Sequence, residues 1–259
     1  GLQADVIVVS GDVQEEAIRR AKALGAHSFI KKPVDPQKLE AALLGLNRMR
    51  PPASAGATPP QHKLPSVNFR DAFREVANIA MGRAAELLGR VLDVFIRLPI
   101  PNVNILEVGE LQMALADAQG NQRVSAICQG YIGSGIAGEA LLIFHDSEIS
   151  DVASLLNNRL DSSSRLELQL DLATIIIGAC LNGLSEQLDM QLSQGHPLVL
   201  GQHCTIDELI RLNRPRWKRT LAVEISYALE NHDIQFDLML LFTEDSVPKL
   251  QQRIELLIN

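Results

Sequence analysis

The feature that most constrains the fold is an internal repeat with a period near 97 residues, which begins at about Val67. Each unit predicts the same order of elements: a long helix, a strand, a short segment, a β-hairpin and a closing helix. The long helices are expected at about Phe69 to Leu88 and Leu166 to Leu188, and the hairpins at Arg123 to Phe144 and Thr220 to Phe242. Two such units bury their apolar faces by sharing one sheet. We therefore predict an α/β domain with pseudo-twofold symmetry, in which long helices pack on a largely antiparallel sheet of five or six strands.

Local signals place the ends of several of these elements. Asn68 or Ser66 can cap the first long helix, because both side chains accept a hydrogen bond from a free backbone N–H. A strand is expected at Asp93 to Leu98, and the two hairpins are expected to turn near Gly133 and near Asn231.

A proline-rich stretch divides the chain. Residues 50–66 contain five prolines among small and polar residues and show no apolar periodicity, which predicts a linker. The repeat domain then covers 67–259, with units at about 67–160 and 161–259, and a shorter segment covers 1–49.

The first segment alternates strand and helix. Strands are predicted at Val6 to Val9 and Ser28 to Lys31, and helices at about Glu15 to Leu24 and Pro36 to Leu46. Two consecutive βα units make two parallel strands, which are too few to bury a doubly wound sheet. We therefore expect that this segment does not fold alone and that further strands precede it.

Composition excludes several classes of function. The net charge is −7 and only 4% of the residues are aromatic, so a nucleic-acid partner is not expected. The three cysteines are widely spaced and form no Cys-x-x-Cys motif, which fits a reducing compartment. No apolar stretch approaches the ~18 residues that a membrane helix needs. We expect a cytoplasmic protein without membrane insertion.

A metal site is not expected either. His196, His203 and Cys204 lie near one another in the sequence, but a fourth ligand at zinc-site spacing is missing. A metal hydrolase that uses these three residues is the weakest of the functional alternatives.

The first long helix carries a polar stripe with one unusual position. Asp71, Glu75, Asn78 and Gly82 are spaced so that all four lie on one face within three turns. Glu75 supplies an anionic acceptor, and Asn78 supplies an amide that both donates and accepts hydrogen bonds. A glycine inside a helix costs roughly 1 kcal/mol relative to alanine, so Gly82 predicts that something approaches the helix closely. The stripe is interpreted as a docking face with a polar tip.

The second unit supplies a comparison. At an offset of 96 residues, the second long helix carries Asp171, Thr174 and Gly178 at the positions of the acid, the amide and the glycine. The close-approach glycine and the acid persist, but Thr174 lacks the amide group. We therefore predict one competent site on the first helix and one degenerate site on the second.

The helix from Glu75 to Leu87, together with Ile96 to Pro99 and Tyr131 to Gly138, resembles the CheC/CheX/FliY family of chemotaxis phosphatases. The resemblance implies hydrolysis of the aspartyl phosphate of a CheY-like response regulator. Asn78 would orient a water molecule in line with the phosphoryl group, and Glu75 would pair with the regulator's conserved lysine. It implies no cofactor on the phosphatase domain, and Mg²⁺ in the phosphorylated receiver.

The first segment resembles the C-terminal half of a response-regulator receiver domain. Ser10 matches the hydroxyl residue that contacts the phosphoryl group, and Lys32 with Pro33 matches the family's Lys-Pro signature. The family's acidic pocket and phosphoacceptor aspartate lie on earlier strands, which have no counterpart in this sequence. The substrate would be a separate regulator in trans or the chain's own receiver in cis, in which case Lys32 would pair with Glu75.

Two further alternatives are left open. The repeat domain could be a non-catalytic module that binds a receiver or a flagellar switch protein. Edge strands of the sheet could also pair between two chains and form a homodimer.

Overall fold

The computed structural model describes residues 4–47, 68–106, 110, 123–156, 165–205, 208–209 and 220–258. The predicted linker at 50–66 and the predicted boundary between the two units near residue 160 lie outside the described residues.

The first segment folds as two βα units, as predicted. It comprises β1 (Ile7–Ser10), α1 (Glu15–Ala23), β2 (Ser28–Lys31) and α2 (Pro36–Asn47). The two strands pair in parallel, from Ile7 opposite Ser28 to Ser10 opposite Lys31.

The elements of the repeat domain fall into two similar sets. The first set is α3 (Phe69–Leu92), β3 (Ile96–Arg97), β4 (Asn102–Leu106), β5 (Val124–Gly133), β6 (Ile136–His145) and α5 (Ile149–Leu156). The second set is α6 (Arg165–Gln187), β7 (Ser193–Gln194), β8 (Leu198–Cys204), β9 (Thr220–Leu229), β10 (Gln235–Thr243), a 3₁₀ turn (Glu244–Ser246) and α8 (Val247–Ile258). Asn68 caps α3, because its side chain accepts a hydrogen bond from the Asp71 N–H.

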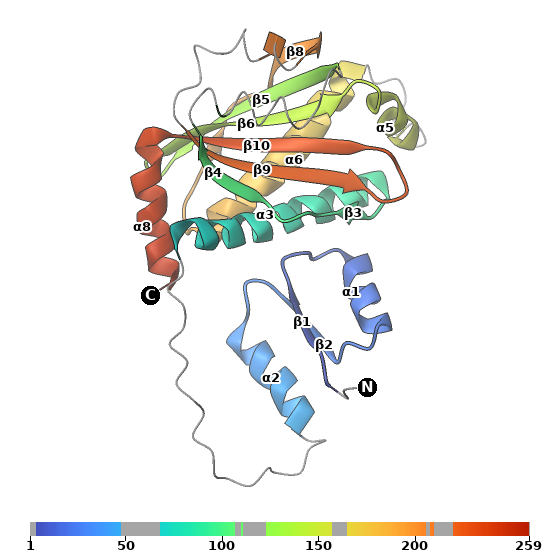
Figure 1. The fold of residues 1–259 in the computed structure, drawn as a ribbon, viewed down its shortest axis with the longest axis vertical. Coiled ribbons are helices and arrows are strands. Elements are labelled where there is room, and N and C mark those ends of the chain that lie inside the picture. Colours follow the sequence, from blue (N-terminus) through green and yellow to red (C-terminus); the bar gives the residue numbers. More distant parts are fainter. Residues whose placement is uncertain are drawn as a thin grey trace.

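Among its described residues, the repeat domain is built on one antiparallel sheet of eight strands (Figure 1). The strand order is β3-β9-β10-β6-β5-β7, with β4 also paired to β9 and β8 also paired to β5. The predicted fold class is confirmed, but the predicted count of five or six strands is wrong. The prediction missed β4 and β7, because β4 is a short outer strand and β7 has only two residues. The strand expected at Asp93 to Leu98 is reduced to Ile96–Arg97.

The register of the central strands shows the pseudo-twofold axis. β6 and β10 are neighbours in the sheet, and Leu141 lies directly opposite Met239. These two residues are 98 positions apart, close to the period of the repeat, so they are equivalent positions of the two units. The axis therefore passes between them, and each hairpin lies on its own side of it.

Residues of the central strands pack alternately in two apolar clusters, because successive side chains point to opposite faces of a sheet. Ala140, Leu142 and Phe144 pack in the main core together with α3 and α6, whereas Leu141 and Ile143 belong to a smaller cluster on the other face. The two long helices thus cover one face of the sheet, side by side (Figure 1).

The crossing of the two long helices depends on a glycine that the sequence analysis did not single out. A Cβ atom on Gly183 of α6 would lie 2.8 Å from the Cα atom of Ala80 on α3, so only glycine fits at this point. Arg83 of α3 also pairs with Glu186 of α6.

The helix α6 corrects one expectation. It has 23 residues and is apolar enough over an 18-residue window to cross a membrane by length and composition. The expectation that no stretch approaches this length is therefore wrong. Many of its apolar residues, including Leu172, Ile176 and Leu184, are buried in the core with α3 and the sheet.

Gly183→Ala should lower the free energy of unfolding by about 1–3 kcal/mol, because the added methyl group overlaps the Ala80 backbone and forces the helices apart. Gly178→Ala on the same helix is the matched control. A Cβ there meets only the Gln194 side chain at 3.6 Å, so that variant should be neutral or gain up to ~1 kcal/mol of helix propensity. Urea unfolding of both variants checks this, and equal effects would contradict the close packing at Gly183.

A buried histidine should make stability depend on pH. His145, only 7% exposed, lies at the end of β6 with its Nε2 atom 3.8 Å from a carboxylate oxygen of Asp237. Contact with Asp237 is the main cause that raises the pKa of His145, and the charge of Glu148 adds to it, while burial opposes it.

A raised histidine pKa stabilises the fold below the ordinary value of about 6.5, and this contribution is lost as the pH rises through the raised pKa. Asp237→Asn should therefore cost most at pH 5.5, with a pH-dependent part on the order of 1 kcal/mol that fades above neutral pH. Urea unfolding between pH 5.5 and 8.5 measures this, with Asp171→Asn as an exposed control. A pH-independent cost would show that His145 is not charged through Asp237.

Candidate docking and catalytic face of helix α3

The first segment meets the repeat domain along one edge of its two-stranded sheet. β1 ends at Ser10 and Lys32 follows β2 directly, so both residues lie at the carboxyl edge of the parallel strands. The Lys32 N–H donates to the Ser10 carbonyl at 2.9 Å, which holds the two ends together. Figure 1 shows α3 lying between this segment and the large sheet. Open α/β sheets bind their ligands at this same edge.

Glu75 and Lys32 form an ion pair across the contact. The Lys32 Nζ atom lies 2.7 Å from Glu75 Oε1, and the two side chains are 26% and 46% exposed. Glu75 lies on the outer face of α3, whereas its neighbours Phe73 and Val76 pack in the apolar core. This is the pair that the two resemblances predict if the chain's own first segment docks on α3.

The next turns of α3 are in contact with the loop after β1. A Cβ atom on Gly82 would lie 2.0 Å from the carbonyl oxygen of Gly11, so the loop backbone rests directly on the helix. A Cβ atom on Gly11 would in turn lie 3.3 Å from the Asn78 side-chain nitrogen. The close approach expected at Gly82 is thus present, and it buries Gly82.

The Ser10 hydroxyl is engaged locally. Its oxygen accepts a hydrogen bond from the Asp12 N–H at 3.1 Å, which shapes the turn that rests on α3. Burial is the main influence on Asp12 and raises the pKa of its carboxyl group, although bonds from Gln14 act in the opposite direction. At the start of α3, Asp71 pairs with Arg74 of its own helix at 3.2 Å.

The equivalent face of α6 differs from that of α3 in its exposure, in its hydrogen bonds and in the surroundings of its glycine. Asp171 and Thr174 are exposed, and the Thr174 hydroxyl donates to the Leu170 carbonyl of its own helix at 2.8 Å. The expected close approach at Gly178 is not found among the described residues, where a Cβ would make only an ordinary contact with Gln194. Only α3 therefore carries a docked segment in the described structure.

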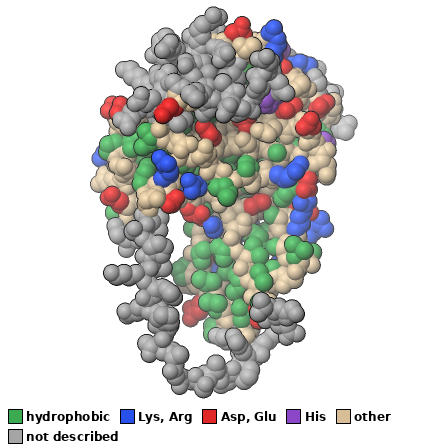
Figure 2. Space-filling view, in the orientation of Figure 1, with side chains coloured by type: hydrophobic (Ala, Val, Ile, Leu, Met, Phe, Trp, Pro, Cys, Tyr) green, Lys and Arg blue, Asp and Glu red, His purple; other side chains and the backbone are tan. Residues whose placement is uncertain are grey.

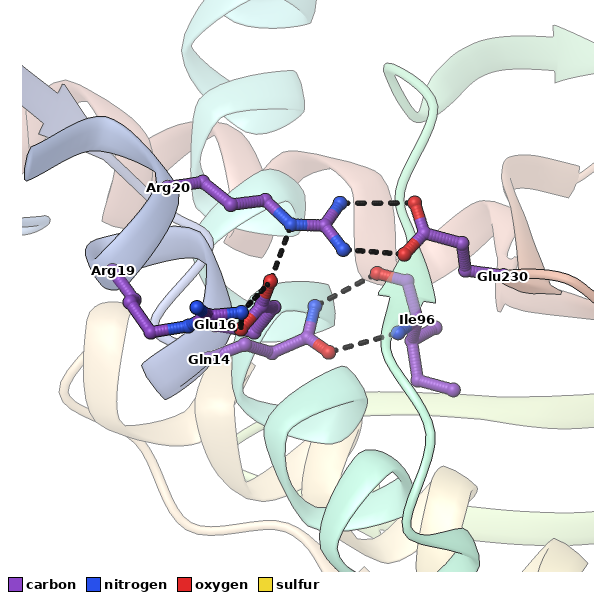
Figure 3. A network of polar contacts seen from close by, with 6 residues as sticks. All are labelled: Gln14, Glu16, Arg19, Arg20, Ile96 and Glu230. Carbon is purple, nitrogen blue, oxygen red and sulfur yellow. Dashed lines mark hydrogen bonds and ion pairs between the residues drawn. The ribbon is translucent and has the colours of Figure 1, made fainter. Parts of the chain in front are cut away.

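Two residues of the first segment that the sequence analysis missed make further contacts with the repeat domain (Figure 3). The Gln14 side chain donates to the Ile96 carbonyl at 2.7 Å and accepts from the Ile96 N–H at 2.9 Å. Gln14 is 5% exposed. In the sequence, Gln14 is an ordinary polar residue that directly precedes a predicted helix. No local pattern indicates that its partner lies 82 positions away.

Arg20 forms the second missed contact. Its guanidinium group makes two hydrogen bonds with the carboxylate of Glu230, at the end of β9, one of them at 2.9 Å. It also lies 4.3 Å from the centre of the Phe95 ring and bonds Glu16 on its own helix at 2.6 Å. The bonds with Glu230, and then Glu16, raise the pKa of Arg20, and those with Arg20 lower the pKa of Glu230.

The metal-hydrolase alternative gains no support from the geometry. His203 Nδ1 lies 2.7 Å from an Asp146 carboxylate oxygen, and the Cys204 thiol is directed to the Val124 carbonyl. Burial raises the pKa of Cys204, which disfavours the thiolate that a metal binds. Among the described residues, no group of three or more His, Cys, Asp or Glu side chains is placed to hold a metal ion.

Comparison with known proteins gives structural matches only. No family model matches the chain, and no curated protein matches it. FliY from Thermotoga maritima is 18% identical, with a TM-score of 0.50, and the match covers 72% of this chain and 96% of that one. The FliM middle domain from Vibrio alginolyticus is 11% identical, with a TM-score of 0.50 and coverage of 70% and 99%. CheX from Vibrio vulnificus is 12% identical, with a TM-score of 0.45 and coverage of 65% and 99%.

These similarities are at the level of the fold. The mixed α/β architecture with its largely antiparallel sheet is the fold of FliY, and the FliM middle domain matches it equally well. Similar structures thus include both chemotaxis proteins of the CheC, CheX and FliY type and a FliM middle domain.

Proposed function

We propose that this chain is a cytoplasmic chemotaxis signalling protein that hydrolyses the aspartyl phosphate of a CheY-like response regulator, with α3 as its docking and catalytic face. One observation carries the proposal. The α3 face, with Glu75, Asn78 and Gly82, lies against the carboxyl edge of a parallel strand pair that presents Ser10 and Lys32. That edge resembles the phosphoryl-binding edge of a receiver.

In this proposal Glu75 holds the helix in register. Its 2.7 Å ion pair with Lys32 spans the contact, and both side chains remain partly exposed. Screening by solvent makes such a pair a modest source of affinity. Its main effect is geometric, because it fixes which turn of α3 faces the edge.

Asn78 is the catalytic residue in this proposal. It lies between Glu75 and Gly82 on the face that contacts the Gly11 loop, one turn beyond the ion pair. Its amide group can accept a hydrogen bond from a water molecule and donate one to a phosphoryl oxygen. An asparagine is not a base, so it acts by placing the water in line with the acyl phosphate, which is already reactive. A preorganised group of this kind contributes about 10² to 10³ in rate.

The divalent ion belongs to the substrate in this mechanism. Among the described residues, no group of three or more metal-binding side chains is placed to hold an ion. We expect Mg²⁺ to arrive with the phosphorylated receiver. In trans, the phosphoryl group would lie on a separate regulator that takes the place of the first segment. In cis, it would need a phosphoacceptor aspartate beside the edge that carries Ser10 and Lys32, and this sequence contains no counterpart of that aspartate.

A non-catalytic receiver-binding module is the second candidate. The fold shared with the FliM middle domain favours it, because that likeness is as strong as the likeness to FliY. The two candidates use the same docking face and differ in whether Asn78 performs chemistry.

Asn78→Ala should abolish accelerated dephosphorylation, a loss of about 10² to 10³ in rate, because the water is no longer oriented. The measurement is phosphate release from a panel of receivers phosphorylated with acetyl phosphate, using the full chain. Thr174→Ala on the exposed face of α6 is the matched control and should keep the activity of the unaltered chain. Binding without any Asn78-dependent phosphate release would favour the non-catalytic module.

A further inference from the structure

The first segment is held to the repeat domain at two separate places. One is the α3 face, where Glu75 and Gly82 contact Lys32 and Gly11. The other, which we call the anchor, consists of Gln14 and Arg20 on the first segment and of Phe95, Ile96 and Glu230 on the repeat domain. Figure 3 shows the hydrogen bonds of Gln14 with Ile96 and of Arg20 with Glu230. The proposed function uses only the first of these places, so the anchor needs its own explanation.

The Gln14 side chain is directed to the repeat domain and not to its own helix. Gln14 is the N-cap residue of α1, yet its side chain makes no capping bond and is directed to both backbone groups of Ile96. Asp12 orients it by accepting from the Gln14 N–H at 3.0 Å and from its side-chain amide at 3.2 Å. The side-chain hydrogen bonds of Gln14 to Ile96 therefore stabilise the docked arrangement and contribute no cap to α1.

The Arg20 contact recognises a particular partner. Its planar guanidinium group forms paired bonds with Glu230 and stacks over Phe95, a combination that a lysine could not reproduce. The adjacent Arg19 pairs with Glu16 of its own helix, and within the described part of the chain it forms no ion pair with the repeat domain. Neighbouring arginines on one helix thus differ in whether they contact the other part of the chain.

We propose that Gln14 and Arg20 are specificity-determining residues that reserve the α3 face for the chain's own first segment over a separate receiver. The inference rests on the proposed function for the role of that face. A lysine and a backbone carbonyl, the groups that meet Glu75 and Gly82, are available on any receiver-like partner. The anchor adds contacts outside that face, and covalent linkage raises the effective concentration of the first segment.

Charge reversal tests the anchor in the full chain. Arg20→Glu places a third carboxylate beside Glu16 and Glu230, so the segment should undock more often. Exchange of the Ile96 N–H, whose acceptor is Gln14, should become about tenfold faster. Exchange of the Leu240 N–H in the central strand β10 should stay unchanged, which separates undocking from global unfolding. The swap Arg20→Glu with Glu230→Arg should recover most of the protection.

Arg19→Glu is the matched control, since it reverses a charge on the same helix and also removes a pair with Glu16. It should change Ile96 exchange less than twofold. Unchanged exchange in Arg20→Glu, an equal effect of Arg19→Glu, or failure of the swap to restore protection would each overturn the anchor.

Selectivity is read from binding, which does not depend on catalysis. An intact stand-alone receiver phosphorylated with acetyl phosphate should bind Arg20→Glu about tenfold more tightly than the unaltered chain, because the α3 face is free more often. Unchanged or weaker binding alongside faster Ile96 exchange would overturn the selectivity. If Asn78→Ala left phosphate release unaltered, the proposed enzyme function would fail while these exchange and binding results would still stand.

Discussion

The close approach of the Gly11 backbone to Gly82 is the constraint on which the arrangement of the two parts depends. No side chain larger than glycine's fits there, since a Cβ atom would lie 2.0 Å from a carbonyl oxygen. Because the loop rests on the helix itself, Lys32 comes within ion-pair distance of Glu75 and Asn78 lies beside the loop. A bulkier residue would hold the edge of the strand pair away from both polar side chains.

The two units of the repeat have kept their packing and diverged at their surfaces. The axis between Leu141 and Met239 relates the hairpins, and α3 and α6 occupy similar places on the sheet. Their outer faces differ, because α3 carries a docked segment whereas Asp171 and Thr174 on α6 are exposed. Gly178 keeps the glycine without a close neighbour, and Gly183 instead allows the two helices to cross. A duplicated core can therefore support one specialised face.

The docked segment leaves much of its own apolar surface uncovered. Val6, Leu24, Leu43 and Leu44 are between 47% and 90% exposed, and hydrophobic side chains gather over this part of the molecule in Figure 2. Its buried positions, Gly11, Val13, Gln14 and Ile30, include those of the loop that meets α3. Two parallel strands bury little by themselves, so contacts with the repeat domain contribute to the stability of this segment.

Periodicity and spacing in the sequence were enough to predict the elements whose form depends on neighbouring residues. These include the two βα units, the long helices, the hairpins and the polar stripe with Glu75 and Asn78. They follow from the sequence because helical and strand periodicity are properties of consecutive residues. The resemblances anticipated the pair of Lys32 with Glu75. Only the tertiary structure decided the other contacts between the two parts of the chain. The contacts of Gln14 with Ile96 and of Arg20 with Glu230 join positions 82 and 210 residues apart, and no local pattern specifies such pairs.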